Sequence, residues 1–226
     1  MRAAVMQPYF FPYAGYFRLA AASDVFVVLD NVQFPRRGWV HRNRLHLANG
    51  DLEWLTLPIA KAAQSVLIQE LQYQTLSGSE QEDWRSRQLR RFPALASVLH
   101  LHPDIACLAL EPAGSPAAQI ESGIRRVLAL LDIERPLVKA SELGIPQGLR
   151  AQELIIALTK AVGADSYINA PGGRDIYNAH DFARAGVDLG FLPPYQGSFA
   201  SVLERLATST PSKIAQELLA QCQIEK

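Results

Sequence analysis

Short, uninterrupted apolar runs separated by stretches with helical spacing are the main pattern along this chain. The first two runs, residues 3–6 and 25–29, carry no charge, and the second is rich in β-branched side chains. Such runs are typical of strands buried on both faces of a parallel sheet. The residues after Pro12 have the apolar composition of a helix that ends near Ser23. The start of the chain therefore predicts a strand–helix–strand unit of the βαβ type.

Later apolar runs predict further strands at residues 136–140, 166–169 and 187–192. Residues 66–71 are consistent with one more short strand, and residues 152–162 have the spacing of an apolar-faced helix. The stretch from about 79 to 133 reads as a helix-rich insertion. We expect one α/β domain over residues 1–226, with a Rossmann-like, mostly parallel sheet, a β-hairpin insertion and a helical middle section.

The hairpin is predicted by Asn49-Gly50, which separates residues 39–47 from residues 52–57. Strand alternation places His41, Asn43 and Leu45 on one face and Arg42, Arg44 and His46 on the other. An arginine-rich face suits an anion such as a phosphate, because the guanidinium group binds it in a bidentate way. A solvated surface segment is the alternative interpretation.

The balanced charge of the chain indicates that any electrostatic recognition depends on local clusters of charged residues. Lys plus Arg number 22 and Asp plus Glu number 22, so no overall field favours a nucleic-acid partner. Two cysteines are too few for a disulfide framework or a zinc site. No apolar run approaches the roughly 20 residues of a membrane span, and no signal-peptide pattern opens the chain. We expect a cytoplasmic protein without a metal centre.

Unusual residues gather where the predicted strands end. Gln7 to Tyr9 follow the first strand and Asp30 follows the second, and ligands of parallel sheets bind beyond the carboxyl ends of the strands. Gly172 and Gly173 follow the strand at 166–169, where backbone amides can approach an anion. A plain tight turn is the alternative for this pair, because the spacing of a nucleotide-binding fingerprint is absent.

Residues 6–17, 24–34, 37–44 and 54–58 resemble the WbqC-like protein family, and the likeness extends over nearly the whole chain. The resemblance implies a bacterial protein of surface-polysaccharide or glycoside biosynthesis. Residues 172–177 fall where such proteins carry a similar glycine-containing stretch. One departure is His41, which stands where the family pattern has an asparagine.

A second resemblance concerns the fold. The strand, the stretch 11–16 and the following helix are similar to the start of nucleotidylyltransferases with an H-x-G-H signature, with Tyr13 and Tyr16 in the histidine places. This resemblance implies a nucleotide-like pocket. It disfavours adenylyl transfer itself, because a neutral phenol stabilises phosphate charge less than a histidine does.

The family context and the cationic strand together predict transfer of an acyl or aminoacyl group to the amine of a nucleotide-linked or glycosidic amino sugar. We expect direct attack on an acyl thioester, no permanently bound cofactor, and an acyl or aminoacyl carrier protein as a candidate partner. Nucleotidyl transfer or ATP-dependent ligation, with ATP and magnesium, is one alternative. A non-catalytic nucleotide-sugar-binding protein is another.

The residues expected to carry this function fall into two groups. The candidate catalytic residues are Asp30, Asp175 and Tyr13, with an aspartate as the base that takes a proton from the attacking ammonium. The candidate binding residues supply guanidinium groups, amides, aromatic rings and backbone amides: Gln7, Pro8, Tyr9, Tyr16, Gln33, Arg37, Trp39, Arg42, Asn43, Arg44, Lys61, Gly172, Gly173, Arg174 and Tyr177.

Overall fold

A five-stranded sheet, in which every pairing is parallel, forms the centre of the computed structural model, which describes residues 1–225. The strands lie in the order β5-β2-β1-β6-β7. Their bounds are β1 (Arg2–Met6), β2 (Val25–Val28), β5 (Leu137–Lys139), β6 (Ser166–Asn169) and β7 (Asp188–Phe191). Numbered by chain order, the strands of this sheet lie in the order 3-2-1-4-5, which is compatible with a Rossmann-like fold. The strand order switches between β1 and β6, although these two strands are parallel.

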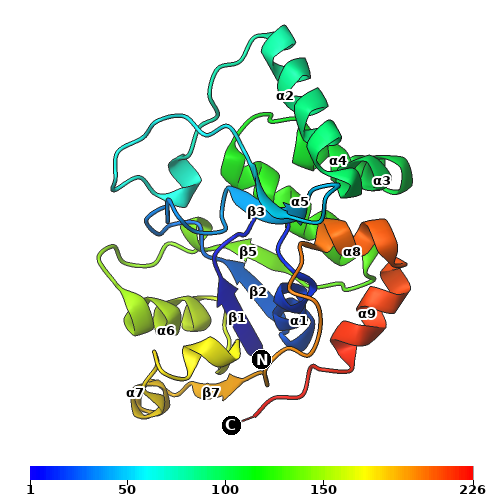
Figure 1. Cartoon of the computed structure of the whole chain (residues 1–226). Helices are drawn as coiled ribbons and strands as arrows, with labels where there is room; N and C mark the ends of the chain where they lie inside the picture. The colour runs from blue at the N-terminus through cyan, green and yellow to red at the C-terminus, as the bar shows by residue number, and fades with distance from the viewer. Residues whose placement is uncertain (226) are drawn as a thin grey trace.

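Helices cover both faces of the sheet (Figure 1). Ala4 and Phe26 belong to the apolar cluster on the side of α1 (Ala14–Ala22) and α9 (Pro211–Leu219). Their strand neighbours Val5 and Val27 belong to a second cluster with α6 (Ala151–Ala161), α7 (Ala179–Arg184) and Tyr167. Because successive strand residues point to opposite faces and helices cover both, residues 3–6 of β1 and all of β2 are apolar, as the uninterrupted runs predict.

The antiparallel hairpin of β3 (Arg42–His46) and β4 (Leu52–Thr56) lies beyond the carboxyl ends of the strands, beside the helices of the middle section (Figure 1). These helices are α2 (Gly78–Arg91), α3 (Pro93–Leu101), α4 (Pro103–Leu110) and α5 (Pro116–Leu130), and α8 (Val202–Thr208) packs against α3. Pro93, Pro103 and Pro116 each occupy the first turn of a helix. Proline is favoured there but interrupts a helix further along, so the middle section is divided into short helices.

The strand predicted at residues 66–71 is wrong: the segment forms the 3-10 turn η1 (Ile68–Glu70). The Glu70 carboxylate accepts a hydrogen bond from the Leu67 backbone amide at 2.9 Å, which closes a turn in place of a ladder. Only one isolated bridge, between Gln33 and Leu67, keeps a strand-like pairing here. Within residues 1–225, no helix is both long enough and apolar enough to cross a membrane.

Candidate functional site

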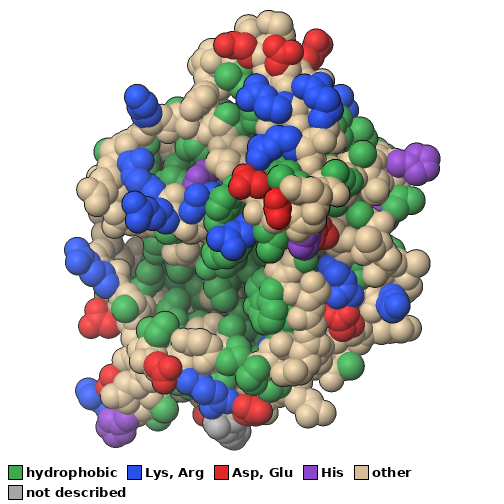
Figure 2. Space-filling model, viewed as in Figure 1, with side chains coloured by type: hydrophobic (Ala, Val, Ile, Leu, Met, Phe, Trp, Pro, Cys, Tyr) green, Lys and Arg blue, Asp and Glu red, His purple; other side chains and the backbone are tan. Residues whose placement is uncertain are grey.

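The carboxyl edge of the sheet is hollowed, and this hollow is the candidate site. The loops that follow the five strands meet there beneath the hairpin (Figure 1). Hydrophobic side chains line the hollow, and Lys and Arg side chains gather along its upper border (Figure 2). A crevice at this edge is where parallel sheets bind ligands.

Hydrogen bonds join the bend after β1 to the hairpin. Asn43, which is buried, donates from Nδ2 to the carbonyl oxygens of Phe10 at 3.0 Å and Phe11 at 2.6 Å. Ser201 Oγ donates to the Phe11 carbonyl at 2.7 Å, and the Phe10 amide donates to the Trp39 carbonyl at 2.9 Å. Phe11 has a positive φ of 42°, which is strained for an aromatic residue. The side chains of Asn43 and Ser201 therefore hold a bend that the backbone does not prefer.

Two arginines of the hairpin stack on one tryptophan. The guanidinium carbons of Arg42 and Arg44 lie 4.0 and 4.8 Å from the centre of the Trp54 ring. Arg44 is the direct cross-strand partner of Trp54, and Arg42, two residues earlier, lies on the same face of β3. The Trp39 ring, 41% exposed, lies 5.1 Å from the Trp54 ring. We call Trp39, Arg42, Arg44 and Trp54 the arginine–tryptophan face. It confirms the alternation predicted for β3 and offers cations and an aromatic surface together.

Polar and aromatic side chains follow β1. Tyr16 is buried and donates from its hydroxyl to the Gln7 carbonyl at 2.9 Å, so it positions the bend and does not line the hollow. Pro8 is buried, whereas Gln7, Tyr9 and Tyr13 are half-buried. Burial raises the pKa of the Tyr9 and Tyr13 phenols, so both stay protonated and can donate hydrogen bonds near neutral pH.

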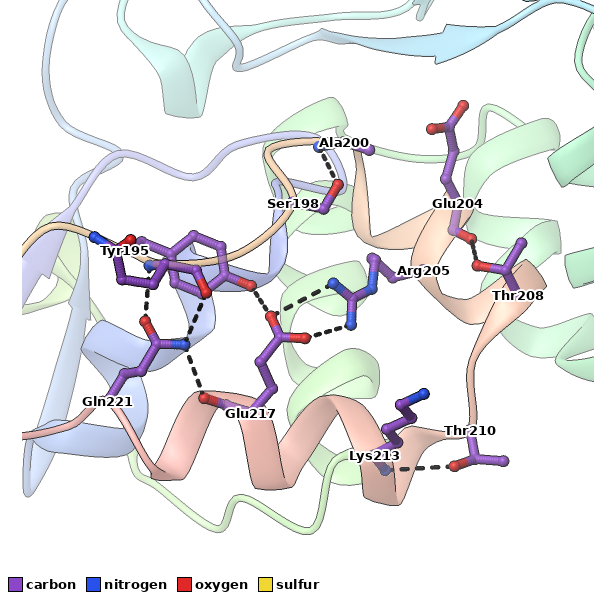
Figure 3. A network of polar contacts seen from close by, with 11 residues as sticks. Tyr195, Ser198, Ala200, Glu204, Arg205, Thr208, Thr210, Lys213, Glu217 and Gln221 are labelled. Atoms are coloured by element: carbon purple, nitrogen blue, oxygen red, sulfur yellow. Dashed lines mark hydrogen bonds and ion pairs between the residues drawn. The ribbon is translucent and has the colours of Figure 1, made fainter.

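The loop after β7 supports Tyr13. The Tyr13 ring centre lies 5.6 Å from that of Tyr195 and 5.0 Å from that of Phe199. The Tyr195 hydroxyl donates to the Glu217 carboxylate, which also pairs with Arg205 at 2.6 Å (Figure 3). The helices α8 and α9, far from Tyr13 in sequence, therefore fix the aromatic wall on this side.

The diglycine turn η3 (Pro171–Gly173) follows β6, the neighbour of β1 in the sheet. Gly173 is buried, and Asn169, at the end of β6, lies against it. Asn169 accepts a hydrogen bond from the Ala170 amide at 2.8 Å, and its Nδ2 makes no hydrogen bond within residues 1–225. Asn169 was not among the expected site residues. A polar side chain that ends a buried strand before Pro-Gly-Gly is the signal that could have found it.

Replacing Gly173 by alanine is expected to disturb this turn, whereas replacing Gly172 is not. A Cβ on Gly173 would lie 2.5 Å from Asn169 Nδ2 and 3.2 Å from Phe191 Cε1, while a Cβ on Gly172 would meet nothing within 4 Å. We expect Gly173→Ala to lower the free energy of unfolding by about 1–3 kcal/mol and Gly172→Ala to change it by less than about 0.5 kcal/mol. Urea denaturation of the two variants checks this, and equal losses would contradict the crowding of Gly173.

The two candidate aspartates have different surroundings. Asp30 is buried, and its carboxylate accepts hydrogen bonds from the Ser141 amide at 2.9 Å and the Ser141 hydroxyl at 2.6 Å. These bonds join the end of β2 to the turn η2 (Ala140–Glu142) after β5. Asp175 is exposed on the loop after β6 and makes no side-chain hydrogen bond within the described residues. A free carboxylate at this edge is therefore supplied by Asp175.

The remaining predicted residues divide between the edge and the interior. Gln33 is exposed and donates to the Gln64 carbonyl at 2.8 Å, beside Arg37 in a shallow hollow. Lys61 is exposed and shares another hollow with His41. Arg174 turns to Glu225, 2.6 Å away, and Tyr177 packs on Tyr167 and Phe182. The structure thus brings the bend, the hairpin and the diglycine turn to one edge, but directs Arg174 and Tyr177 elsewhere.

His41 makes the stability of the hairpin depend on pH. Burial, with Arg42 nearby, lowers the pKa of its imidazole to about 4, from 6.5. The unfolded chain binds the proton more readily between these values, so stability is complete above about pH 6.5 and falls as the pH drops toward 4. We expect the free energy of unfolding to fall by about 1–2 kcal/mol over this range, less than the full linkage value because the ring is partly solvated.

Urea denaturation at pH 7 and pH 4.5 of His41→Asn and of the unmodified protein checks this. The variant should lack the part of the fall that comes from His41. The same loss in both proteins would contradict the assignment to His41.

Fold and edge together define an α/β protein with a Rossmann-like parallel sheet and an arginine-bearing crevice at its carboxyl edge. No three His, Cys, Asp or Glu side chains within residues 1–225 come together as a set that could hold a metal ion. A model of the WbqC-like protein family matches residues 7–202, and the chain belongs to this family. The resemblance drawn from the sequence is thereby confirmed.

The chain is also similar to a curated relative, the uncharacterized protein Rv1507c of Mycobacterium tuberculosis (strain ATCC 25618 / H37Rv). The two are 23% identical over 184 residues, which is 80% of this chain and 77% of the relative. No solved structure matches the chain.

Proposed function

We propose that this protein transfers an acyl or aminoacyl group from a thioester to the amine of a nucleotide-linked or glycosidic amino sugar. The observation that carries the proposal is the arginine–tryptophan face. The hairpin that carries Arg42, Arg44 and Trp54 lies beyond the carboxyl edge of a Rossmann-like sheet (Figure 1). Arg42 and Arg44 are held against Trp54, so their guanidinium groups are ordered before a ligand arrives. Ordered guanidinium groups suit a diphosphate, and the exposed Trp39 ring suits a sugar or a base.

The reaction assigns roles to the residues at the edge. The amine of the sugar attacks the thioester carbonyl, a C–N bond forms, and the C–S bond breaks as the thiolate leaves and takes up a proton. Asp175 accepts the proton that the attacking ammonium loses, because its carboxylate is exposed, whereas that of Asp30 is occupied by Ser141. The Tyr13 phenol, protonated at neutral pH, donates to the carbonyl oxygen as negative charge develops there. Gln7 and Asn169 offer amides to the sugar hydroxyls.

Mass spectrometry of nucleotide-linked amino sugars incubated with acyl and aminoacyl thioesters tests the proposal. We expect an amide product. We also expect a lower kcat/KM in the Arg42→Gln/Arg44→Gln variant, mainly through a rise in KM, because these side chains bind the substrate. Arg87→Gln is the matched control, since Arg87 is exposed on α2 and makes no hydrogen bond or ion pair within residues 1–225. Absence of an amide product across a broad donor panel would reject the proposal.

Nucleotidyl transfer is the second candidate, favoured by the strand order and by the likeness of residues 11–16 to the H-x-G-H segment. Tyr13 and Tyr16, which stand in the histidine places, weigh against it. The Tyr16 hydroxyl is already bound to the Gln7 carbonyl, which removes it as a phosphate ligand. This candidate predicts release of pyrophosphate and dependence on magnesium, which direct acyl transfer does not. A protein that binds nucleotide sugars without turnover would release neither pyrophosphate nor an amide.

A further inference from the structure

A cavity of about 730 Å³ lies at the carboxyl ends of β2 and β5, apart from the arginine–tryptophan face. It is bounded by the loop before α6, by the turn η1 and by the segment after β2, on the side of Figure 1 where α6 lies. Its volume is in the range of small-ligand sites. Of the residues expected to form the site, only Gln33 lines this cavity, which is otherwise unassigned.

The cavity wall combines aliphatic side chains with the side-chain amides of Asn and Gln, and one of the described residues that line it is charged. Its apolar part is supplied by Val32, Leu67, Ile145, Leu149 and Leu154. Its amides are supplied by Asn31, Gln33, Gln69 and Gln147, and its one charged residue is Arg150. Asp30 is not among the lining residues, and its carboxylate accepts hydrogen bonds from the Ser141 amide and hydroxyl. Such a lining suits a flat, partly apolar ligand that makes many hydrogen bonds and carries negative charge at one end.

One hydrogen-bond acceptor in the wall lacks a donor. Asn31 Oδ1 is buried and has no hydrogen-bond partner within residues 1–225. A buried acceptor left without a partner costs about 1–3 kcal/mol of stability, and a ligand donor that reached it from the cavity would remove that cost. The N–H groups of a nucleobase and the hydroxyls of a ribose are donors of this kind.

The start of α6 contributes the charged residue of the wall, Arg150. Arg150 is exposed, makes no ion pair within the described residues, and directly precedes α6. Its side chain does not cap this helix, and the first residue, Ala151, lines the cavity together with Leu154. A guanidinium group beside the uncapped start of an eleven-residue helix favours a phosphate.

We infer that this cavity binds the nucleoside phosphate portion of a nucleotide-linked substrate. The base or ribose donates to Asn31 Oδ1, the apolar side chains contact the ring, and the phosphate lies toward Arg150 and the start of α6. The identification of the ligand as part of a nucleotide-linked substrate rests on the proposed function. The arginine–tryptophan face then binds the distal phosphate and the sugar of that substrate, as in the proposed function.

Isothermal titration calorimetry with the 5′-monophosphates of adenosine, guanosine, cytidine, uridine and thymidine tests the inference. We expect at least one of them to bind. Arg150→Gln and Asn31→Leu should each weaken its binding by about tenfold or more, because each removes a contact from a buried or charged partner. Arg87→Gln should leave it within about twofold. Arg150 is exposed, so Arg150→Gln keeps the test decisive even if Asn31→Leu lowers the melting temperature.

Two outcomes would overturn the inference. One is no binding of any monophosphate up to about 5 mM, including the case in which pantetheine binds instead. The other is binding that is lost in Arg42→Gln/Arg44→Gln but kept in Arg150→Gln, which would place the nucleotide on the hairpin. Either outcome is distinct from failure of the proposed function, because amide formation is measured separately. Nucleotide binding that depends on Arg150, without any amide product, would support the cavity and reject the transfer reaction.

Discussion

Replacing Asn43 by alanine is expected to lower the free energy of unfolding by about 3 kcal/mol, and the melting temperature by roughly 6–10 °C. The Asn43 side chain is 4% exposed and donates to two carbonyl oxygens of the bend, those of Phe10 and Phe11. It also accepts a hydrogen bond from the Arg44 amide at 2.7 Å. Its loss removes three hydrogen bonds, and Phe11 must still keep its positive φ.

The measurement is urea denaturation at pH 7, with Asn49→Ala as the control of the same chemistry. Asn49 is exposed in the hairpin turn, so its loss should cost less than about 1 kcal/mol. Ser201→Ala adds a second test, because Ser201 Oγ donates to the same Phe11 carbonyl. The double variant should lose more than the sum of the single losses, since the carbonyl then has neither donor. Strict additivity would show that the two side chains do not share this acceptor.

The sheet could be predicted from the sequence because its signal is local. Residues 25–29 are apolar at every position, and in the structure Val27 and Phe26 face opposite clusters of helices, as a run without alternation requires. Arg42 and Arg44 could likewise be placed on one face of β3, because strand alternation is a property of neighbouring residues.

The partners of polar side chains could not be predicted in this way, because they come from distant parts of the chain. Asp30 is bound by Ser141, 111 residues later, and Arg174 by Glu225, 51 residues later. From the sequence alone, the Asp30 carboxylate at the end of a strand and the Arg174 guanidinium group beside two glycines both suggest ligand contacts. Their partners within the chain cannot be read from the neighbouring residues. Asn43 is the same case: its position on the inner face of β3 could be inferred, but not the two carbonyl oxygens that it holds.

The last expected result distinguishes the two aspartates by activity and stability together. Under the proposed transfer reaction, Asp175→Asn should lower kcat by about 100-fold or more, because an amide cannot accept the proton of the ammonium. Its free energy of unfolding should change by less than about 0.5 kcal/mol, since Asp175 is exposed and holds no other residue. Asp30→Asn should lower stability by about 1–3 kcal/mol, because the Ser141 amide and hydroxyl then face only one acceptor oxygen.

The decisive comparison is between kcat and urea denaturation for Asp175→Asn, Asp30→Asn and Ser141→Ala. Ser141→Ala removes the hydroxyl that donates to Asp30 while leaving both carboxylates intact. If Asp30 is a positioning residue, Asp30→Asn and Ser141→Ala should lose stability in parallel and keep kcat within about tenfold. If Asp30→Asn instead abolishes turnover while Asp175→Asn does not, the base is Asp30. The Ser141 hydrogen bonds would then serve to orient a catalytic carboxylate and not only to join β2 to β5.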